Sequence, residues 1–239
     1  MVPVLYADDD ILIVDKPCGL AVQPGEGVRT SLVDVVERDL GFRPYLVHRL
    51  DRETAGCIVV ARSPRAAARV SELLGGRGTV KTYRALVAGL PSPATGAYRD
   101  AVRVRGRELS AETRYRVALG GERFSLVEAE LGTGRNHQVR LHFAAAGHPI
   151  LGDDRHGDFA LNRALGKELG VKKLMLYAWR LILPLSPPVE AVAALPPHFT
   201  AFFERSGFGT EFIDAVISPR AGTSPRTDGS PPGDGDGRR

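Results

Sequence analysis

The chain has 239 residues, 43% of them hydrophobic and 25% charged, which suits a protein that buries a core without disulfides or structural metal. Its two cysteines, Cys18 and Cys57, have no redox or zinc-binding spacing, so we expect two buried, reduced thiols. No apolar run is long enough to cross a bilayer, and the N-terminus lacks the pattern of a signal peptide. We therefore expect a cytoplasmic protein with no membrane span, and a monomer by default.

The net charge is +4 and the isoelectric point is about 9.3, so the chain is mildly basic. Only five of its 32 basic side chains are Lys, and Arg is the residue that grips phosphates with two parallel hydrogen bonds. A coding bias towards Arg explains the same composition equally well. Charge alone therefore permits a nucleic-acid partner without identifying one.

Periodicity and capping residues divide the chain into elements. The predicted strands are 4–16 (two short strands), 56–61, 80–88, 109–117, 124–131 and 174–183. The predicted helices are 30–41, 63–74, a helix capped by Thr133 or Asn136 that ends before Gly147, and 198–205. Most strands follow one another without an intervening helix. This order predicts an α+β fold with a mixed, mainly antiparallel sheet and flanking helices.

The composition changes at Ser218. From there to the C-terminus no aliphatic residue is larger than Ala and no aromatic residue occurs. Such a segment cannot bury enough apolar surface to offset the entropy that it would lose on ordering. We therefore predict one folded domain over residues 1–217 and a disordered tail over residues 218–239.

Residues 48–56, HRLDRETAG, form a dense polar run just before a predicted buried strand, where loops often present functional groups. Asp51 lies between Arg49 and Arg52, and cationic neighbours keep a carboxylate ionised and nucleophilic. A surface loop held by salt bridges is the alternative. Taken alone, the segment favours that alternative.

Residues 132–142, GTGRNHQVRLH, combine a Gly-rich turn with the polar first turns of a helix, a pattern suited to binding phosphate or carboxylate. His137, His142 and His148 also suggest a zinc site. Their spacings of five and six residues place them on no common face, however, so we expect no metal. A helix with a solvated polar face is the plainer interpretation.

Residues 81–87, KTYRALV, are expected to form a strand with Lys81, Tyr83, Ala85 and Val87 on one face. Tyr83 is placed to stack on a base, although a half-buried core tyrosine is the commoner role. This segment therefore supports a nucleic-acid site only in combination with the other two.

In combination and in this order, the segments resemble the RluA-type RNA pseudouridine synthase family. That family has a His-Arg-Leu-Asp loop (here 48–51), a Lys-x-Tyr strand (81–83), a Gly-Arg-Thr-His-Gln-Ile-Arg helix start (134–140) and a Gly-His-Pro-Ile-Leu-Gly-Asp turn (147–153). A Lys-Pro-x-Gly turn, here residues 16–19, precedes them.

The resemblance implies the pseudouridine synthase fold with a central catalytic cleft. It also implies isomerisation of specific uridines in structured ribosomal or transfer RNA, without a cofactor. Asp51 would be the nucleophile and Arg140 its partner, while Tyr83 would stack on the uracil and assist removal of the C5 proton. The candidate RNA contacts are Arg49, which would help to unstack the target nucleotide, Arg135 and His137.

Three positions depart from the family pattern: Ala55, Asn136 and Tyr177 stand where Ser, Thr and His are usual. None removes a catalytic group, but they bear on substrate preference. The chain begins at its first strand, so we expect the catalytic domain, helped by the Arg-containing tail, to bind RNA. Two rivals are a hydrolase of glycosidic bonds with Glu53 as a second carboxylate, and an RNA-binding module without activity.

Overall fold

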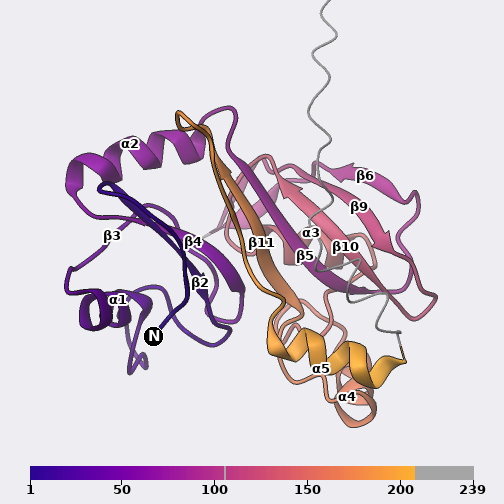
Figure 1. Cartoon of the computed structure of the whole chain (residues 1–239). Coiled ribbons are helices and arrows are strands. Elements are labelled where there is room, and N and C mark those ends of the chain that lie inside the picture. Colours follow the sequence, from indigo (N-terminus) through magenta and orange to yellow (C-terminus); the bar gives the residue numbers. More distant parts are fainter. Residues whose placement is uncertain (105, 208–239) are drawn as a thin grey trace, which may run out of the picture.

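The computed structural model describes residues 1–104 and 106–207 (Figure 1). In this part of the chain, ten strands form one sheet and two short strands form a separate hairpin. The strands are β1 (Val4–Ala7), β2 (Ile11–Lys16), β3 (Tyr45–Leu46), β4 (Ala55–Ala61), β5 (Val80–Ala88), β6 (Thr95–Tyr98), β7 (Val102–Val104), β8 (Arg107–Leu109), β9 (Thr113–Leu119), β10 (Phe124–Leu131), β11 (Leu176–Leu183) and β12 (Val189–Val192).

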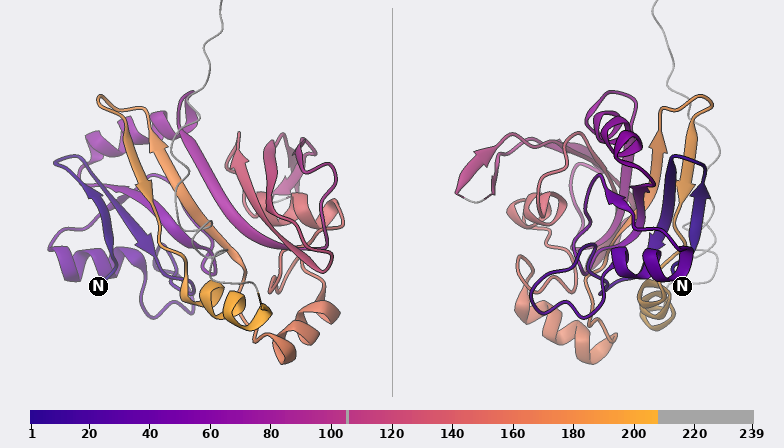
Figure 2. Two further views of the ribbon diagram at one scale, coloured as in Figure 1. Left: turned by 45° about the vertical axis from the view of Figure 1, so that its right-hand side comes forward. Right: turned by 90° about the vertical axis from the view of Figure 1, so that its left-hand side faces the viewer.

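The helices lie around this sheet. They are α1 (Leu32–Leu40), α2 (Pro64–Gly75), α3 (Gln138–Ala145), α4 (Phe159–Glu168) and α5 (Pro197–Ser206). The first two accompany the N-terminal half of the sheet, and in the right-hand view of Figure 2 helices α3 and α5 lie on opposite sides of it. None of these described helices combines the length and the apolar character that a membrane crossing requires.

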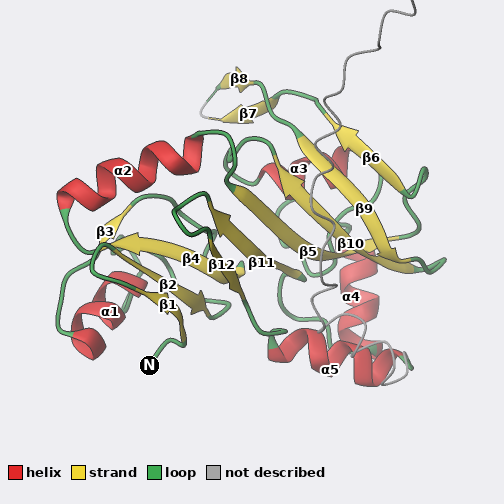
Figure 3. Cartoon of the chain, turned by 45° about the horizontal axis from the view of Figure 1, so that its top comes forward, coloured by secondary structure: helices red, strands yellow, loops and turns green. Residues whose placement is uncertain are grey.

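The main path of the sheet runs β1-β2-β4-β11-β5-β10-β9-β6, with β3 paired to β4 and β12 paired to β11. β4 and β11 run parallel, and the other described strand pairs are antiparallel. The β7–β8 hairpin stands apart from the sheet (Figure 3). The predicted α+β fold with a mixed, mainly antiparallel sheet is therefore confirmed.

Gly56 allows the two halves of the sheet to meet. It has a φ of +107°, and a Cβ atom added there would lie 2.2 Å from the backbone oxygen of Ala178 on β11. Only glycine tolerates both the left-handed backbone and this close approach. The sequence before β4, which carries Asp51, is consequently brought to the junction between the halves.

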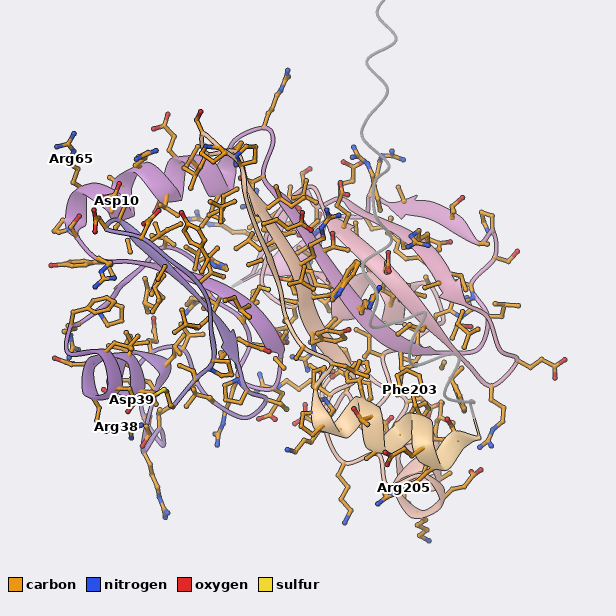
Figure 4. The ribbon with its side chains drawn as sticks, in the orientation of Figure 1. Asp10, Arg38, Asp39, Arg65, Phe203 and Arg205 are labelled. Carbon is orange, nitrogen blue, oxygen red and sulfur yellow. The ribbon has the colours of Figure 1, made fainter. Side chains whose placement is uncertain are left out.

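The two faces of the sheet have different partners. On the α1 side, Leu32 and Val36 pack with residues of β2 and β4 in one buried apolar cluster. On the other side, α5 contributes three buried phenylalanines, and the ring of Phe199 packs edge-on against Tyr177 of β11. Figure 4 labels one of these phenylalanines, Phe203, on α5. Burial on both faces fixes the sheet that carries the polar loops.

Local capping rules predicted the first two helices well. Ser31 forms a reciprocal capping box with Asp34, and Ser63 accepts a hydrogen bond from the backbone N–H of Ala66. Gly41 ends α1 in the left-handed conformation.

Other predictions need correction. The cap of α3 is His137 rather than Thr133 or Asn136, and it makes no side-chain capping bond. The strand predicted over 109–117 is split between β8 and β9, and β3, β6, β7, β12 and α4 were not predicted. Cys57 is buried, but Cys18 is only half-buried. The end of the predicted domain and the predicted tail, residues 208–239, lie outside the described residues.

His48 continues the β3–β4 pairing with its side chain. Its Nε2 atom accepts a hydrogen bond of 3.1 Å from the backbone N–H of Val59, in the middle of β4. Burial, together with the charge of Lys81, lowers the pKa of His48 to about 4. The ring is therefore neutral in the folded protein at neutral pH.

Acid should destabilise the fold through His48. Because its pKa is about 4 in the folded protein and about 6.5 in the unfolded chain, the unfolded state binds more protons between these values. Stability should be fully present above pH 6.5 and fall by up to about 3 kcal/mol as the pH drops to 4.

Urea unfolding of the wild type and of His48→Gln at steps between pH 7 and pH 4 measures this contribution. The variant should be less stable at pH 7 but lose less stability on acidification. Parallel curves for the two proteins would show that His48 does not titrate in this range.

Candidate active site

A cleft of about 720 Å³ opens between the loop that precedes β4 and the turn that starts α3. Strand β5 contributes Lys81 and Tyr83 to its wall, which confirms that these two residues share a face. Among the described residues, one carboxylate lines the cleft, that of Asp51, against five cationic side chains: Arg49, Arg52, Lys81, Arg135 and Arg140. The cleft therefore suits a polyanionic ligand.

Asp51 and Arg140 meet in this cleft although 89 positions separate them in the chain. An Nη1–H of Arg140 donates a hydrogen bond of 3.1 Å to Oδ2 of Asp51. The guanidinium is buried, with 4% of the side chain exposed, whereas 23% of the Asp51 side chain is exposed to the cleft. The carboxylate is thus oriented from behind and accessible from the front.

Asp153 fixes Arg140 in this position. Two parallel hydrogen bonds of 2.7 Å join the guanidinium to Asp153, which also accepts the backbone N–H groups of Arg155 and His156. Burial alone would raise the pKa of Asp153, but these bonds hold it below its usual value. For Arg140, burial alone would lower the pKa. Its bonds to Asp153 and Asp51 outweigh this effect, so the pKa of Arg140 is raised.

The loop that carries Asp51 is tied to the turn after β2 by a fully buried lysine. The ammonium of Lys16 donates to the carbonyl oxygens of Pro17, Leu20 and Arg52, at 2.8–3.1 Å. Burial lowers the pKa of Lys16 to about 8. The side chain of Arg52 donates back to the carbonyl oxygen of Gly19 at 3.0 Å. These bonds hold the loop that carries Asp51 in place before any ligand arrives.

Gln138 organises the opposite wall. Its buried amide oxygen accepts bonds from the Thr133 hydroxyl and the Arg135 backbone N–H, while its amide nitrogen donates to the Glu112 carbonyl and the Thr113 hydroxyl. The side chain uses every polar direction that it has. The turn that displays Arg135 to solvent is therefore a fixed structure.

Tyr83 lies on the cleft wall, half-buried. Burial, with smaller effects from Asp51 and Cys57, raises the pKa of its phenol far above the usual value. The ring is therefore neutral throughout the physiological range and presents a flat surface to the cleft.

The three histidines that were considered as zinc ligands lie in different surroundings. His137 lies in the cleft, with its Nε2 3.6 Å from Oδ2 of Asp51. His142 is buried and bonds to the Thr113 hydroxyl and the Asp100 carbonyl. His148 bonds to the Ala88 carbonyl. The three rings do not converge on one point.

Arg49 and Arg52 lie beside Asp51 in the sequence. Among the described residues, neither of them forms an ion pair with Asp51. Arg49 is exposed on the rim of the cleft, and Arg52 pairs with Glu53 at 3.7 Å. Arg135 is also exposed, with its Nε donating to the Ser110 carbonyl at 3.3 Å. The partner of Asp51 is Arg140 of the distant α3, as the family resemblance implied.

Sequence reasoning assigned no role to Asp153, Gln138 or Lys16. Each is buried, and a buried polar residue has to be hydrogen-bonded. Their neighbours in the chain include other polar residues, such as Asp15, His137 and Asp154, so nothing in the sequence marked these three as buried.

The departures from the family pattern lie at different distances from the cleft. Asn136 is exposed and lines it. Ala55 is buried in β4, and Tyr177 packs against Phe199 of α5. Only Asn136 is therefore in position to touch a ligand directly.

The sequence and the fold both match known proteins. Residues 10–145 match the RNA pseudouridylate synthase family. An uncharacterized RNA pseudouridine synthase of Aquifex aeolicus is 38% identical over 177 residues, and these cover 64% of this chain and 55% of the relative. Ribosomal large subunit pseudouridine synthase C of Salmonella typhi is 36% identical over 193 residues, which cover 73% and 60%. The chain thus spans little more than half the length of these relatives.

Among solved structures, human RNA Pseudouridylate Synthase Domain Containing 4 superposes with a TM-score of 0.72 at 28% identity, over 85% of this chain and 92% of the other. Human RNA Pseudouridylate Synthase Domain Containing 1 has the same fold, with a TM-score of 0.68 at 23% identity. The match of more than half of the sequence and the shared fold lead to one conclusion: this chain belongs to the RNA pseudouridylate synthase family.

Proposed function

We propose that this protein isomerises specific uridines in structured RNA to pseudouridine, with Asp51 as the nucleophile and without a cofactor. The observation that supports it most directly is the Asp51 carboxylate, which Arg140 holds at 3.1 Å in a cleft lined by cations. Membership of the family supplies the reaction class.

The reaction needs a group that holds one fragment of the nucleotide while the other fragment turns. The bond between C1′ and N1 breaks, the uracil turns, and a bond forms between C1′ and C5. A carboxylate that holds one fragment covalently lets the other turn without being lost. Asp51 combines an oriented oxygen with access from the cleft, and Tyr83 offers a neutral ring on which the uracil stacks.

The basic residues around the cleft have separate roles in this proposal. Arg49, exposed on the rim, helps to take the target nucleotide out of its stack, a step that costs a few kcal/mol. Arg135, exposed on the turn before α3, contacts backbone phosphates, and His137 touches the nucleotide beside Asp51.

Large-subunit ribosomal RNA is the first substrate to test, because relatives at 36% identity are named as synthases acting on it. Transfer RNA is the second. The predicted cytoplasmic location and monomeric state stay predictions.

Asp51→Ala should abolish pseudouridine formation while the protein stays folded, because Arg140 keeps its two bonds to Asp153. Wild type and variant would be incubated with unmodified ribosomal and transfer RNA, and pseudouridine would be quantified by mass spectrometry of the digested nucleosides. The matched control is Glu53→Gln, a neighbouring carboxylate that pairs with Arg52 but does not itself line the cleft, and it should keep its activity. Release of free uracil that depends on Glu53 would instead support a hydrolase.

Arg140→Met should lose activity and also stability. It leaves the buried Asp153 without its cation, which typically costs about 3–5 kcal/mol. The double variant Arg140→Met/Asp153→Asn should recover part of this stability in urea unfolding but none of the activity. Full activity of the folded double variant would contradict the role given to Arg140.

Arg135→Ala should weaken RNA binding without changing the rate of turnover on bound RNA. Loss of one phosphate contact lowers the slope of log affinity against log salt concentration by about one. Binding measured at several salt concentrations tests this, with Arg163→Ala on the exposed surface of α4 as the control. An unchanged slope would remove Arg135 from the RNA interface.

A further inference from the structure

His137 has an unusual backbone conformation at the start of α3. Its φ of +54° makes it the one non-glycine residue with positive φ among those described, and its side chain makes no capping bond to the helix. Such a conformation is costly for a residue with a Cβ and persists where the surrounding structure enforces it. The position of the imidazole is therefore determined by something other than helix capping.

The imidazole lies between the nucleophile and a second histidine. Its Nε2 is 3.6 Å from Oδ2 of Asp51, and its Nδ1 is 2.8 Å from Nε2 of His156. His156 follows Asp153 in the turn that fixes Arg140, donates its backbone N–H to Asp153, and has a half-buried side chain. A continuous path thus runs from the edge of Asp51 through two rings towards the surface.

The proposed reaction requires a proton acceptor at this edge. When the uracil reattaches through C5, that carbon still carries its hydrogen, and the aromatic product forms only when this proton leaves. The pair of electrons from the broken C1′–N1 bond is left on N1, which takes up a proton. No oxidant or reductant is involved, and the numbers of protons lost and gained are equal.

Tyr83 is poorly suited to accept that proton by itself. Its raised pKa keeps the phenol protonated, so it would have to give up its own proton first. His137 has the opposite character. Burial lowers its pKa below 6.5; Asp51 opposes this shift, while Arg140, His156 and Arg155 add to it. Its imidazole is therefore neutral at neutral pH and has a free ring nitrogen.

We propose that His137 is a catalytic base in this site: its Nε2 accepts the C5 proton, and its Nδ1 passes a proton to His156 and on to solvent. The bond that Asp51 forms breaks again before the product leaves, and its electron pair returns to the carboxylate. The nucleotide that loses the C5 proton thus still lies within a few ångströms of Oδ2, and therefore within reach of Nε2. N1 takes its proton from water. The proposal rests on the proposed function, and His156 acts in it as a positioning residue.

The test uses His137→Gly, because glycine adopts the positive φ without strain and leaves space for a small base. Single-turnover formation of pseudouridine should slow by about 10²–10⁴-fold, the usual contribution of a general base. Added imidazole should restore part of the rate in proportion to its unprotonated form. RNA with deuterium at C5 should react more slowly than normal RNA in the variant.

Three further variants complete the experiment. His148→Gln, a histidine outside the cleft, should match the wild type and be insensitive to imidazole. His156→Phe should lower the turnover rate less than His137→Gly does, because water can replace the relay, and it should leave KM unchanged. Asp51→Ala should stay inactive with imidazole, which separates failure of the nucleophile from failure of the base.

Each result bears on the proposal. The wild-type rate should fall as the pH drops through the lowered pKa of His137, and this fall should be absent from His137→Gly. Activity of His137→Gly close to that of the wild type would overturn the proposal. So would a loss confined to KM, or a slow reaction that neither imidazole nor C5 deuteration affects, since these mark an RNA contact or a purely structural residue. Activity of Asp51→Ala would instead overturn the proposed nucleophile.

Discussion

The buried guanidinium of Arg140 connects the parts of this molecule that matter for its chemistry. One edge of the guanidinium makes two hydrogen bonds to Asp153, and a further N–H reaches Asp51 on a loop from the other half of the sheet. A buried charge is tolerated only where other groups satisfy it: Asp153 neutralises the guanidinium, and the remaining bond to Asp51 ties the two halves of the sheet together. The cleft consequently lies at the interface between the two halves of the sheet, and both halves contribute residues to it.

The sheet provides the frame for this interface. Parallel pairing of β4 with β11 brings the N-terminal half against the central strands, and Gly56 permits the close approach. Because β5 pairs with β11, Tyr83 faces the end of the loop that carries Asp51. Residues from three distant parts of the chain are placed by strand pairing before any of them contacts a ligand.

The sequence predicted the elements that depend on local rules. Ser31, Gly41 and Ser63 mark helix ends through interactions within a few residues, and the structure has them as expected. The cap of α3 was mispredicted because His137 adopts a left-handed backbone conformation, which is uncommon for a non-glycine residue. Similarly, the alternation over 109–117 did not reveal the break between β8 and β9.

The site was only partly predictable for the same reason. Resemblance to a family identified Asp51, Tyr83 and Arg140, and all three line one cleft. Charge proximity in the sequence suggested Arg49 and Arg52 as partners of Asp51, but tertiary structure directs Arg52 to Gly19 and supplies Arg140 instead. Asp153 and Gln138 act through contacts made only after folding, so their roles could not be read from spacing.

Lys16 affects how much of the conformational change on binding falls to the protein and how much to its ligand. Its three contacts with carbonyl oxygens, together with the bond between the His48 ring and the backbone of β4, leave the loop around Asp51 little freedom to adjust. A rigid site saves ordering entropy on binding but transfers the whole conformational change to its ligand. In the proposed function, the RNA must therefore present a nucleotide that swings out at low cost, so selection among uridines would depend on how easily the RNA deforms locally as well as on its sequence.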